Sequence, residues 1–194
     1  MIQIGIDEVG RGSWAGPIVF AAVGFPSSVD RKDFKKIVIR DSKLMTADQR
    51  KRAEAVIREN AIIHVEYLSS DDIDSLGLSR GFARTIQRLV KKVLRDLPIG
   101  ESSKFWIDGR RMCTLGVEHE YIIKGDRIMP IISAASIVAK VERDAYMTEL
   151  GQRYQEYGFD LHKGYGTARH VKALAEYGIS PVHRRSYRPI KAFL

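Results

Sequence analysis

Hydrophobic residues recur along the chain with two periods, that of a β-strand and that of an α-helix. The two-residue strand period comes first. Isoleucine occupies every second position from Ile2 to Ile6, which predicts a half-buried strand over residues 1–6. The run Ile18 to Val23 is continuously apolar, as is typical of a central strand. Further strands are predicted over residues 63–67, 104–107 and 121–123. The sequence therefore predicts a sheet of several short strands.

Helical periodicity separates these strands. Thr46 and Gln49 fit a capping box, which predicts a helix over residues 46–59. Short helical signals follow around residues 70–76, and a strongly periodic helix is predicted from Ser79 to Asp96. One face of that helix is basic and is either a solvated surface or a track for phosphates: Arg80, Arg84, Arg88, Lys91, Lys92 and Arg95.

A second long helix is predicted from about Ser133. Its expected buried side comprises Ala134, Ile137, Val138, Val141 and Ala145, and its opposite stripe comprises Ser133, Ser136, Lys140 and Arg143. A loop-rich segment, a short helix through Tyr177 and a basic tail follow. Strands interleaved with helices predict one α/β domain over residues 1–194 with a mixed sheet, in which residues from about 160 to 194 form a basic, partly helical extension.

Charge points to a polyanionic partner. The 194 residues carry a formal net charge of +8, and residues 162–194 hold most of it, since Glu176 is their only acid. Such a balance favours nucleic acid first, although a basic tail is also a common solubilising surface. Cys113 is the only cysteine, which excludes an intrachain disulfide and favours a cytoplasmic protein. No stretch approaches the roughly 20 apolar residues of a membrane span, and a signal peptide is not expected.

Acidic residues follow three predicted strands. Asp7 and Glu8 come after the first strand, Asp108 after the fourth, and Asp126 just beyond the fifth. Ligands bind outside the carboxyl ends of strands in open α/β sheets, so these side chains are expected to meet if the first and fourth strands are parallel neighbours. Each acid taken singly is more often a salt-bridge partner, a turn former or a helix cap.

Clustered carboxylates suit hard-metal chemistry. Mg²⁺ prefers oxygen ligands and is commonly held by carboxylates together with substrate phosphates. Two such ions about 3.5–4 Å apart can activate water and stabilise a leaving oxygen in phosphodiester hydrolysis. The sequence shows no zinc-type His/Cys spacing, no Walker loop and no nucleophile elbow, which disfavours those chemistries.

An ordered set of motifs resembles the ribonuclease HII family, the type 2 ribonucleases H. The first is Gly5-Ile6-Asp7-Glu8-Val9-Gly10-Arg11-Gly12 with Ala15-Gly16-Pro17. The others are Asp41-Ser42-Lys43, Ile107-Asp108-Gly109, Lys124-Gly125-Asp126, Ser133-Ala134-Ala135-Ser136-Ile137 with Ala139-Lys140, Arg143-Asp144, His162-Lys163-Gly164-Tyr165 and His183-Arg184-Arg185-Ser186. They occur in the family's order from residue 5 to about 189, which makes the set far more specific than any single motif.

The resemblance implies a ribonuclease H-like fold and assigns site residues. Asp7, Glu8, Asp108 and Asp126 match the catalytic acids that bind two divalent ions, Mg²⁺ or Mn²⁺. Gly10, Arg11 and Gly12 match the turn that holds the ribonucleotide and its phosphate, and Tyr165 matches the tyrosine under its sugar. Further candidates for substrate binding are Lys43, Ser136, His162 and Lys163. The chain departs from the family pattern at Ser13-Trp14, Leu44, Met45 and Gly77, which affects fine substrate contacts rather than the acids.

The function implied is an endonuclease that hydrolyses the RNA strand of RNA–DNA hybrids and incises 5′ of single ribonucleotides in duplex DNA, leaving 3′-hydroxyl and 5′-phosphate ends. The expected partners are these nucleic acids, and the expected state is a monomer. Two alternatives stay open at the level of the sequence: a metal-dependent nuclease of related fold that acts on DNA, and a non-catalytic nucleic-acid-binding module.

Overall fold

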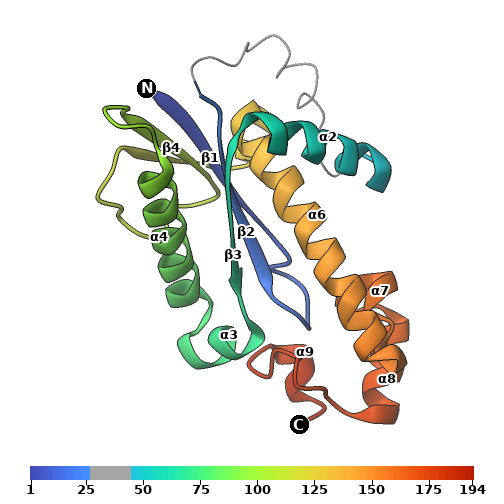
Figure 1. Cartoon of the computed structure of the whole chain (residues 1–194). Coiled ribbons are helices and arrows are strands. Elements are labelled where there is room, and N and C mark those ends of the chain that lie inside the picture. Colours follow the sequence, from blue (N-terminus) through green and yellow to red (C-terminus); the bar gives the residue numbers. More distant parts are fainter. Residues whose placement is uncertain (27–44) are drawn as a thin grey trace.

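The computed structural model describes residues 1–26 and 45–194, which form an α/β fold around a mixed sheet (Figure 1). The strands in sequence order are β1 (Ile2–Val9), β2 (Ile18–Gly24), β3 (Ile62–Leu68), β4 (Ser103–Asp108) and β5 (His119–Ile122). Their order in the sheet is β3-β2-β1-β4-β5. β1 pairs antiparallel with β2 and parallel with β4, so the predicted parallel neighbours are confirmed.

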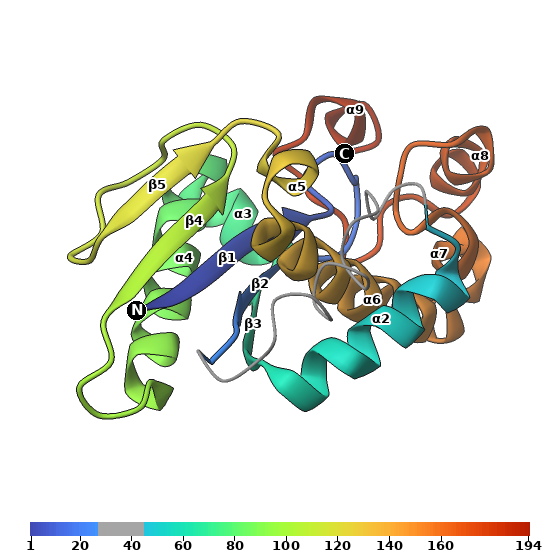
Figure 2. The same cartoon turned by 90° about the horizontal axis from the view of Figure 1, so that it is seen from above.

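Helices cover both faces of the sheet (Figures 1 and 2). They are α2 (Ala47–Asn60), α3 (Ser70–Leu76), α4 (Leu78–Asp96), α5 (Gly125–Ile128), α6 (Pro130–Arg153), α7 (Phe159–His162), α8 (Ala168–Tyr177) and α9 (Arg188–Lys191), with a 3₁₀ turn, η2, at Gln155–Tyr157. The apolar face of α4 packs on one side of the sheet, while α2 and α6 share a second core on the other side. The predicted capping box at Thr46 and Gln49 begins α2.

The first strand is longer than predicted. β1 continues past Ile6 to Val9, and both Asp7 and Glu8 still pair with residues of β2. On its other side, β1 pairs with β4 only as far as Ile6, opposite Ile107. The carboxylates of Asp7 and Glu8 therefore stand where the pairing of β1 with β4 has stopped and its pairing with β2 continues, rather than in a turn.

Helix α6 crosses the sheet in close contact with β1. A Cβ on Gly5 would lie 2.2 Å from the carbonyl oxygen of Ile131, so only glycine allows the two backbones to approach this closely. The predicted sidedness of α6 is wrong in part: Ser133, Ser136 and Arg143 are buried, while Ala145 is exposed. The reason is that α6 is covered by the sheet near its start and by the C-terminal elements near its end, so the buried side changes along its length.

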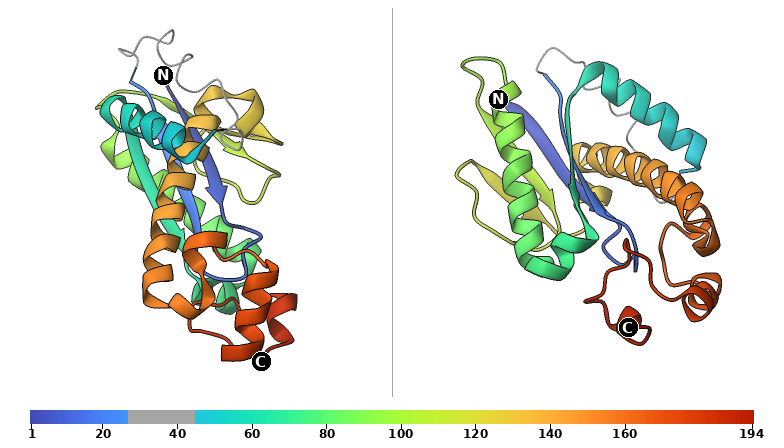
Figure 3. Two further views of the ribbon diagram at one scale, coloured as in Figure 1. Left: turned by 90° about the vertical axis from the view of Figure 1, so that its right-hand side faces the viewer. Right: turned by 60° about the horizontal axis from the view of Figure 1, so that its bottom comes forward.

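The C-terminal elements gather beyond the C-terminal end of β1, the end at which Asp7 and Glu8 lie (Figure 3). A third apolar cluster joins them to Ala15 after β1 and to Met147 and Leu150 of α6. Arg184, which the sequence counts in the basic tail, is fully buried, whereas Arg185 and Arg188 are exposed. Among the helices described, none has the length and apolar character that crossing a membrane requires.

Candidate active site

Three carboxylates converge at the end of β4. Asp7, Glu8 and Asp108 each offer an oxygen atom, and these atoms lie within 4.8 Å of one another. The parallel register that sets Ile6 opposite Ile107 brings Asp7 next to Asp108. The main-chain amide of Glu8 donates to Oδ1 of Asp7 at 2.7 Å, which orients the central carboxylate.

Asp126 approaches the same site from a helix rather than from a strand end. β5 stops at Ile122, and the chain passes through Lys124 in a left-handed conformation, with φ of 58°, into the short helix α5. The amide of Gly125 donates to Oδ1 of Asp108 at 2.6 Å, which ties the start of α5 to the end of β4. Asp126 is buried in the first turn of α5 and lines the pocket, although it is outside the group of three oxygen atoms that lie within 4.8 Å.

One pocket of about 330 Å³ collects most of the predicted site. Its volume suits a single nucleotide unit rather than a whole duplex. The residues that line it are Asp7, Glu8, Val9, Gly10, Arg11, Gly12, Asp108, Asp126, Ser136, Lys140 and Tyr165. One pocket thus contains the four acids, the Gly-Arg-Gly turn, Ser136 and Tyr165. The sequence assigns all of them to a single site, and this arrangement is compatible with that assignment.

Burial and mutual repulsion make the acid cluster unfavourable without a cation. Burial, followed by the charges of Glu8 and Asp108, raises the pKa of Asp7 well above its ordinary value, against a hydrogen bond from Ser136. Burial and the charge of Asp108 raise the pKa of Glu8 to about 7, although Arg11 opposes the shift. At neutral pH the cluster therefore retains protons unless positive charge is supplied from outside.

The donor set fits a hard divalent cation. Carboxylate oxygen atoms within bridging distance of one another are the ligands that Mg²⁺ and Mn²⁺ prefer, and a bound cation would displace the retained protons. No histidine or cysteine joins this carboxylate group among the residues that the structure covers. The residues themselves thus favour an oxygen-ligated metal over zinc.

The Gly-Arg-Gly turn rests on a buried arginine. Gly10 has φ of 97°, and a Cβ there would lie 2.0 Å from Nε of Arg143. Arg143 donates to the carbonyl oxygens of Pro17, Ala15 and Lys163 and to the Ser13 hydroxyl. Burial lowers the pKa of Arg143 to about 10, so the guanidinium remains charged at neutral pH beneath the turn. The sequence placed this arginine on an exposed stripe and so missed its structural role.

A second buried arginine supports the same turn from the C-terminal side. Arg184 donates to the carbonyl oxygens of Gly16 and Arg11 and to the Tyr187 hydroxyl, which itself donates to the Arg11 carbonyl at 2.6 Å. The His183-Arg184-Arg185-Ser186 motif therefore contributes to the site through the backbone of the turn.

Tyr165 stands across the pocket from the turn. Its ring is partly exposed, and a Cβ on Gly12 would lie 3.9 Å from its Cε1 atom. Trp14 packs on the same loop, since its ring fills the space that a Cβ on Gly166 would need. The departure from the family pattern at Ser13-Trp14 is thus in contact with the Tyr165 loop.

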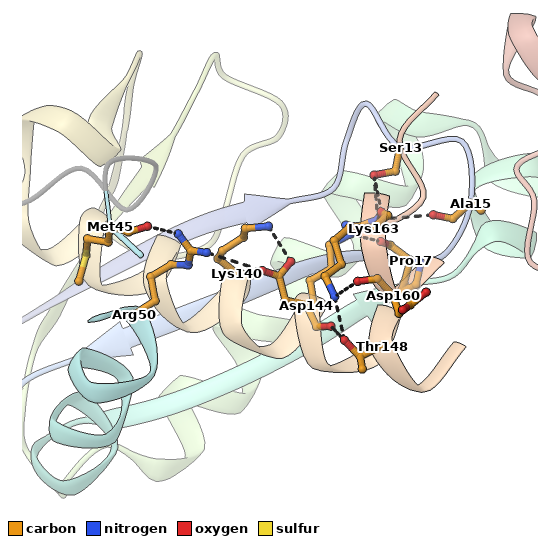
Figure 4. Close-up of polar contacts among 11 residues, drawn as sticks. Ser13, Ala15, Pro17, Met45, Arg50, Lys140, Asp144, Thr148, Asp160 and Lys163 are labelled. Atoms are coloured by element: carbon orange, nitrogen blue, oxygen red, sulfur yellow. Dashed lines mark hydrogen bonds and ion pairs between the residues drawn. The ribbon is translucent and has the colours of Figure 1, made fainter. Parts of the chain in front are cut away.

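Two other predicted residues lie beside the pocket rather than in its lining. His162 bonds the backbone through the carbonyl oxygen of Tyr157 and the amide of Gly164. The Lys163 ammonium donates to Thr148 and to the carbonyl oxygen of Asp160, as Figure 4 shows. Both residues shape the loop that carries Tyr165. Lys43 lies outside the described residues.

Lys140 is a pocket residue that the sequence did not single out for the site. It follows Ser136 by one helical turn of α6 and donates to Asp144 at 2.6 Å, next to Arg50 of α2 (Figure 4). Its position on one stripe with Ser133 and Ser136 was the signal available, because residues four apart share a helix face.

The mixed sheet, the carboxylates at the end of its parallel strands and the positive charge of the chain define a metal-dependent nuclease with a ribonuclease H-like fold. The family model of ribonuclease HII matches residues 4–190, so the chain belongs to the ribonuclease HII family.

Individual relatives agree with this family. The ribonuclease HII of Pelagibacter ubique (strain HTCC1062) is 39% identical over 194 residues, covering 100% of this chain and 99% of that protein. The ribonuclease HII of Dichelobacter nodosus (strain VCS1703A) is 42% identical over 191 residues, covering 98% and 96%. The crystal structure of ribonuclease H2 from Pyrococcus horikoshii OT3 superposes with a TM-score of 0.82 at 26% identity and covers 100% of this chain and 97% of that one.

Family membership defines the chemistry at its coarser level. The protein is a metal-dependent endoribonuclease that acts on RNA–DNA hybrids. The alternative of a non-catalytic binding module is thereby wrong.

Proposed function

We propose that this enzyme also incises duplex DNA on the 5′ side of a single embedded ribonucleotide, with two divalent cations, Mg²⁺ or Mn²⁺, at the carboxylate site. Asp7, Glu8, Asp108 and Asp126 would hold the cations, and the products would carry 3′-hydroxyl and 5′-phosphate ends. The observation that supports the proposal is the shared pocket, in which the carboxylate cluster faces the Gly-Arg-Gly turn and Tyr165.

The side chains of the pocket have separate tasks in this proposal. When bound, the cations would supply Lewis acidity for the attacking water and for the departing oxygen. The hydrogen bonds from Ser136 and from the Glu8 amide hold the Asp7 carboxylate in place. Lys140, which is paired with Asp144, places an ammonium group on the pocket wall, where a phosphate of the cleaved strand would lie.

Recognition of the ribonucleotide is assigned to the turn and the tyrosine. The 2′-hydroxyl is the group that distinguishes RNA from DNA at a single position. Within the described residues, the amides of Arg11 and Gly12 donate no hydrogen bond, which leaves them available to a hydroxyl or a phosphate. The Tyr165 ring closes the opposite side of the pocket, where a sugar would stack.

The C-terminal part is proposed to bind the flanking nucleic acid within one domain of a monomeric enzyme. Its exposed basic side chains are Arg169, Lys172, Arg185, Arg188 and Lys191. They lie on the segment that packs against the turn side of the pocket, so a duplex entering the pocket would pass near them.

The direct test compares three substrates at equal protein concentration in Mg²⁺: an RNA–DNA hybrid, a DNA duplex with one ribonucleotide, and the same duplex made only of DNA. We expect cleavage of the first two, with a single incision 5′ of the ribonucleotide. Asp108→Asn serves as the inactive control, and its folding is checked by circular dichroism. An active sample that cuts the hybrid but leaves the single ribonucleotide intact would contradict the finer activity.

The recognition step has its own variant. Tyr165→Ala is expected to retain the binding of divalent ions and to lose most of the preference for the ribonucleotide site over all-DNA duplex. The preference is measured as the ratio of incision rates, and metal binding by the rise in melting temperature with Mn²⁺. An unchanged ratio would remove Tyr165 from the recognition assignment.

A further inference from the structure

Two buried histidines form a chain of hydrogen bonds that ends on Tyr165. The amide of Ser180 donates to Nδ1 of His183 at 2.9 Å, Nε2 of His183 lies 2.9 Å from Nε2 of His170, and Nδ1 of His170 lies 3.0 Å from the carbonyl oxygen of Tyr165. Neither histidine is more than 1% exposed. The metal site and the proposed substrate contacts do not involve either side chain.

The backbone groups at the two ends determine where each proton lies. A main-chain N–H only donates, so Nδ1 of His183 must accept, and neutral His183 carries its proton on Nε2. Nε2 of His170 must then accept from His183, which leaves the proton of His170 on Nδ1. That nitrogen therefore donates to the Tyr165 carbonyl oxygen, which is a pure acceptor.

The surroundings keep both rings neutral and fixed. Burial lowers the pKa of His170 and that of His183 each to about 4, and neither has a carboxylate partner among the described residues. Trp14, Phe159 and His162 pack around His170, and His162 stacks on it with ring centroids 4.6 Å apart. The positions of the protons therefore persist throughout the neutral pH range.

We infer that His170 and His183 are positioning residues for ribonucleotide recognition: the proton that His183 directs toward His170 makes His170 a donor, and this donor fixes the backbone of Tyr165 opposite Gly12. The inference rests on the proposed function in one respect, namely that Tyr165 contacts the ribonucleotide. The structural part, the direction of the hydrogen bonds, is independent of that function.

The direction is tested first on the wild-type protein without substrate. The ¹⁵N chemical shifts of the imidazole nitrogens report which nitrogen carries the proton. We expect His170 to be protonated on Nδ1 and His183 on Nε2. The opposite tautomer of His170 would overturn the inference, whatever the enzyme cleaves.

A matched pair of variants then separates the donor from the packing. In His170→Asn the amide nitrogen can occupy the place of Nδ1 and still donate to Tyr165, but the side chain is too short to accept from His183. In His170→Gln the amide oxygen can reach the place of Nε2 and accept from His183, but the side chain no longer donates to the Tyr165 carbonyl oxygen, which keeps only its bond from the Thr167 amide. Both variants lose the same stacked ring, so packing losses are shared.

We expect His170→Gln to lose roughly five- to tenfold of the preference for a ribonucleotide site, the effect of about one hydrogen bond, while His170→Asn stays near the wild-type ratio. Thermal stability should rank the other way, because His170→Asn leaves the buried donor of His183 unpaired. Equal losses of preference in both variants, or losses that follow stability, would reduce His170 to a packing role and overturn the inference.

Tyr165→Ala measured beside them distinguishes the two possible failures. If that variant keeps full preference, the assigned role of Tyr165 is wrong and the functional part of the inference falls with it, while the tautomers still test the hydrogen-bond chain. If Tyr165→Ala loses preference and the two His170 variants behave alike, the positioning role alone is wrong.

Discussion

Asp7 places a carboxylate in a buried site beside two others, an arrangement that destabilises the fold when no cation is present. Its pKa is raised chiefly by burial and then by Glu8 and Asp108. A buried carboxylate beside two others lowers the stability of the fold, and such residues are common where sites are built for charged ligands. Replacing the Asp7 carboxylate by an amide of the same shape should therefore separate the effect on stability from the effect on metal binding.

Asp7→Asn is expected to be more stable than the wild type in a metal chelator, by roughly 1 kcal/mol or about 2–4 °C in melting temperature. The asparagine oxygen can still accept from the Glu8 amide, so the local geometry is retained. Addition of Mn²⁺ should raise the melting temperature of the wild type far more than that of the variant, which should also be inactive. Glu149→Gln, at an exposed position of α6, is the control for loss of a charge alone. A variant less stable than the wild type in chelator would contradict this account.

The pH dependence follows from Glu8, whose pKa rises from its ordinary 4.5 to about 7 in the fold. Between these values the folded protein keeps a proton that the unfolded chain has released. Protonated Glu8 therefore contributes to the stability of the metal-free fold, and this contribution is fully present below pH 4.5. It is lost as the pH rises through about 7.

Metal binding should show the opposite trend, because a cation must displace the same proton. We expect Mn²⁺ to bind more weakly below pH 7 than above it. Below pH 7 its binding should also release more protons. Calorimetry in buffers of different ionisation enthalpy measures both quantities. Affinity that does not change across this range would mean that Glu8 is already ionised without metal.

At the scale of the elements, the approach of α6 to β1 decides whether the site assembles. Ser136 and Lys140 reach the pocket from α6, and the contact that sets the spacing is Gly5 against the carbonyl of Ile131. In the sequence, Gly5 appears only as a position of the predicted first strand and as the start of the first motif. Its reason is a neighbour more than a hundred residues away, which local pattern does not contain.

Gly5→Ala should therefore cost about 1–3 kcal/mol of unfolding free energy, because the added methyl forces α6 away from the sheet. Gly116→Ala is the matched control, since nothing lies within 4 Å of its Cβ position. Urea denaturation of both variants measures the difference, and incision rates show whether displacement of α6 also weakens the site. Comparable stability in the two variants would show that the helix adjusts to the methyl group.

Elements were predictable where one local signal dominated. The capping box at Thr46 and the periodicity of α4 gave the right helices, because both depend on neighbours along the chain. The end of β1 was wrong, since the strand continues as long as β2 pairs with it. The burial of Arg143 was also missed, because its partners Ser13, Ala15 and Pro17 lie more than a hundred residues earlier in the chain.

At the scale of the whole molecule, exposed basic side chains gather at two places, among others, in the part of the chain that the structure describes. One is the exposed face of α4, which includes Arg84 and Arg95, and the other is the C-terminal part with Arg185 and Arg188. Only the second lies on elements that also support the pocket, through the bond from Arg184 to the Arg11 carbonyl. The C-terminal surface is therefore expected to contribute more to nucleic-acid affinity.

The paired replacement of Arg185 and Arg188 by glutamine should weaken binding of a ribonucleotide-containing duplex. It should also reduce the salt dependence of binding by roughly one unit of slope for each phosphate that an arginine no longer neutralises. The same replacement of Arg84 and Arg95 removes equal charge from α4 and is the control. Affinity is measured at several salt concentrations with the inactive Asp108→Asn background. A larger effect from the α4 pair would move the duplex to the other face of the molecule.

The sequence by itself determined the family and the alternation of strands and helices, and it singled out four acids as candidates for the site, because ordered motifs and local periodicity are properties of the chain. The tertiary structure decided how close the acids come: Asp7, Glu8 and Asp108 meet within 4.8 Å, whereas Asp126 joins from α5. It also decided that Arg143, Arg184 and the paired histidines are buried against the backbone of residues next to or in the pocket lining. These placements depend on strand register, helix approach and the return of the C-terminus, all of which are contacts between residues far apart in sequence.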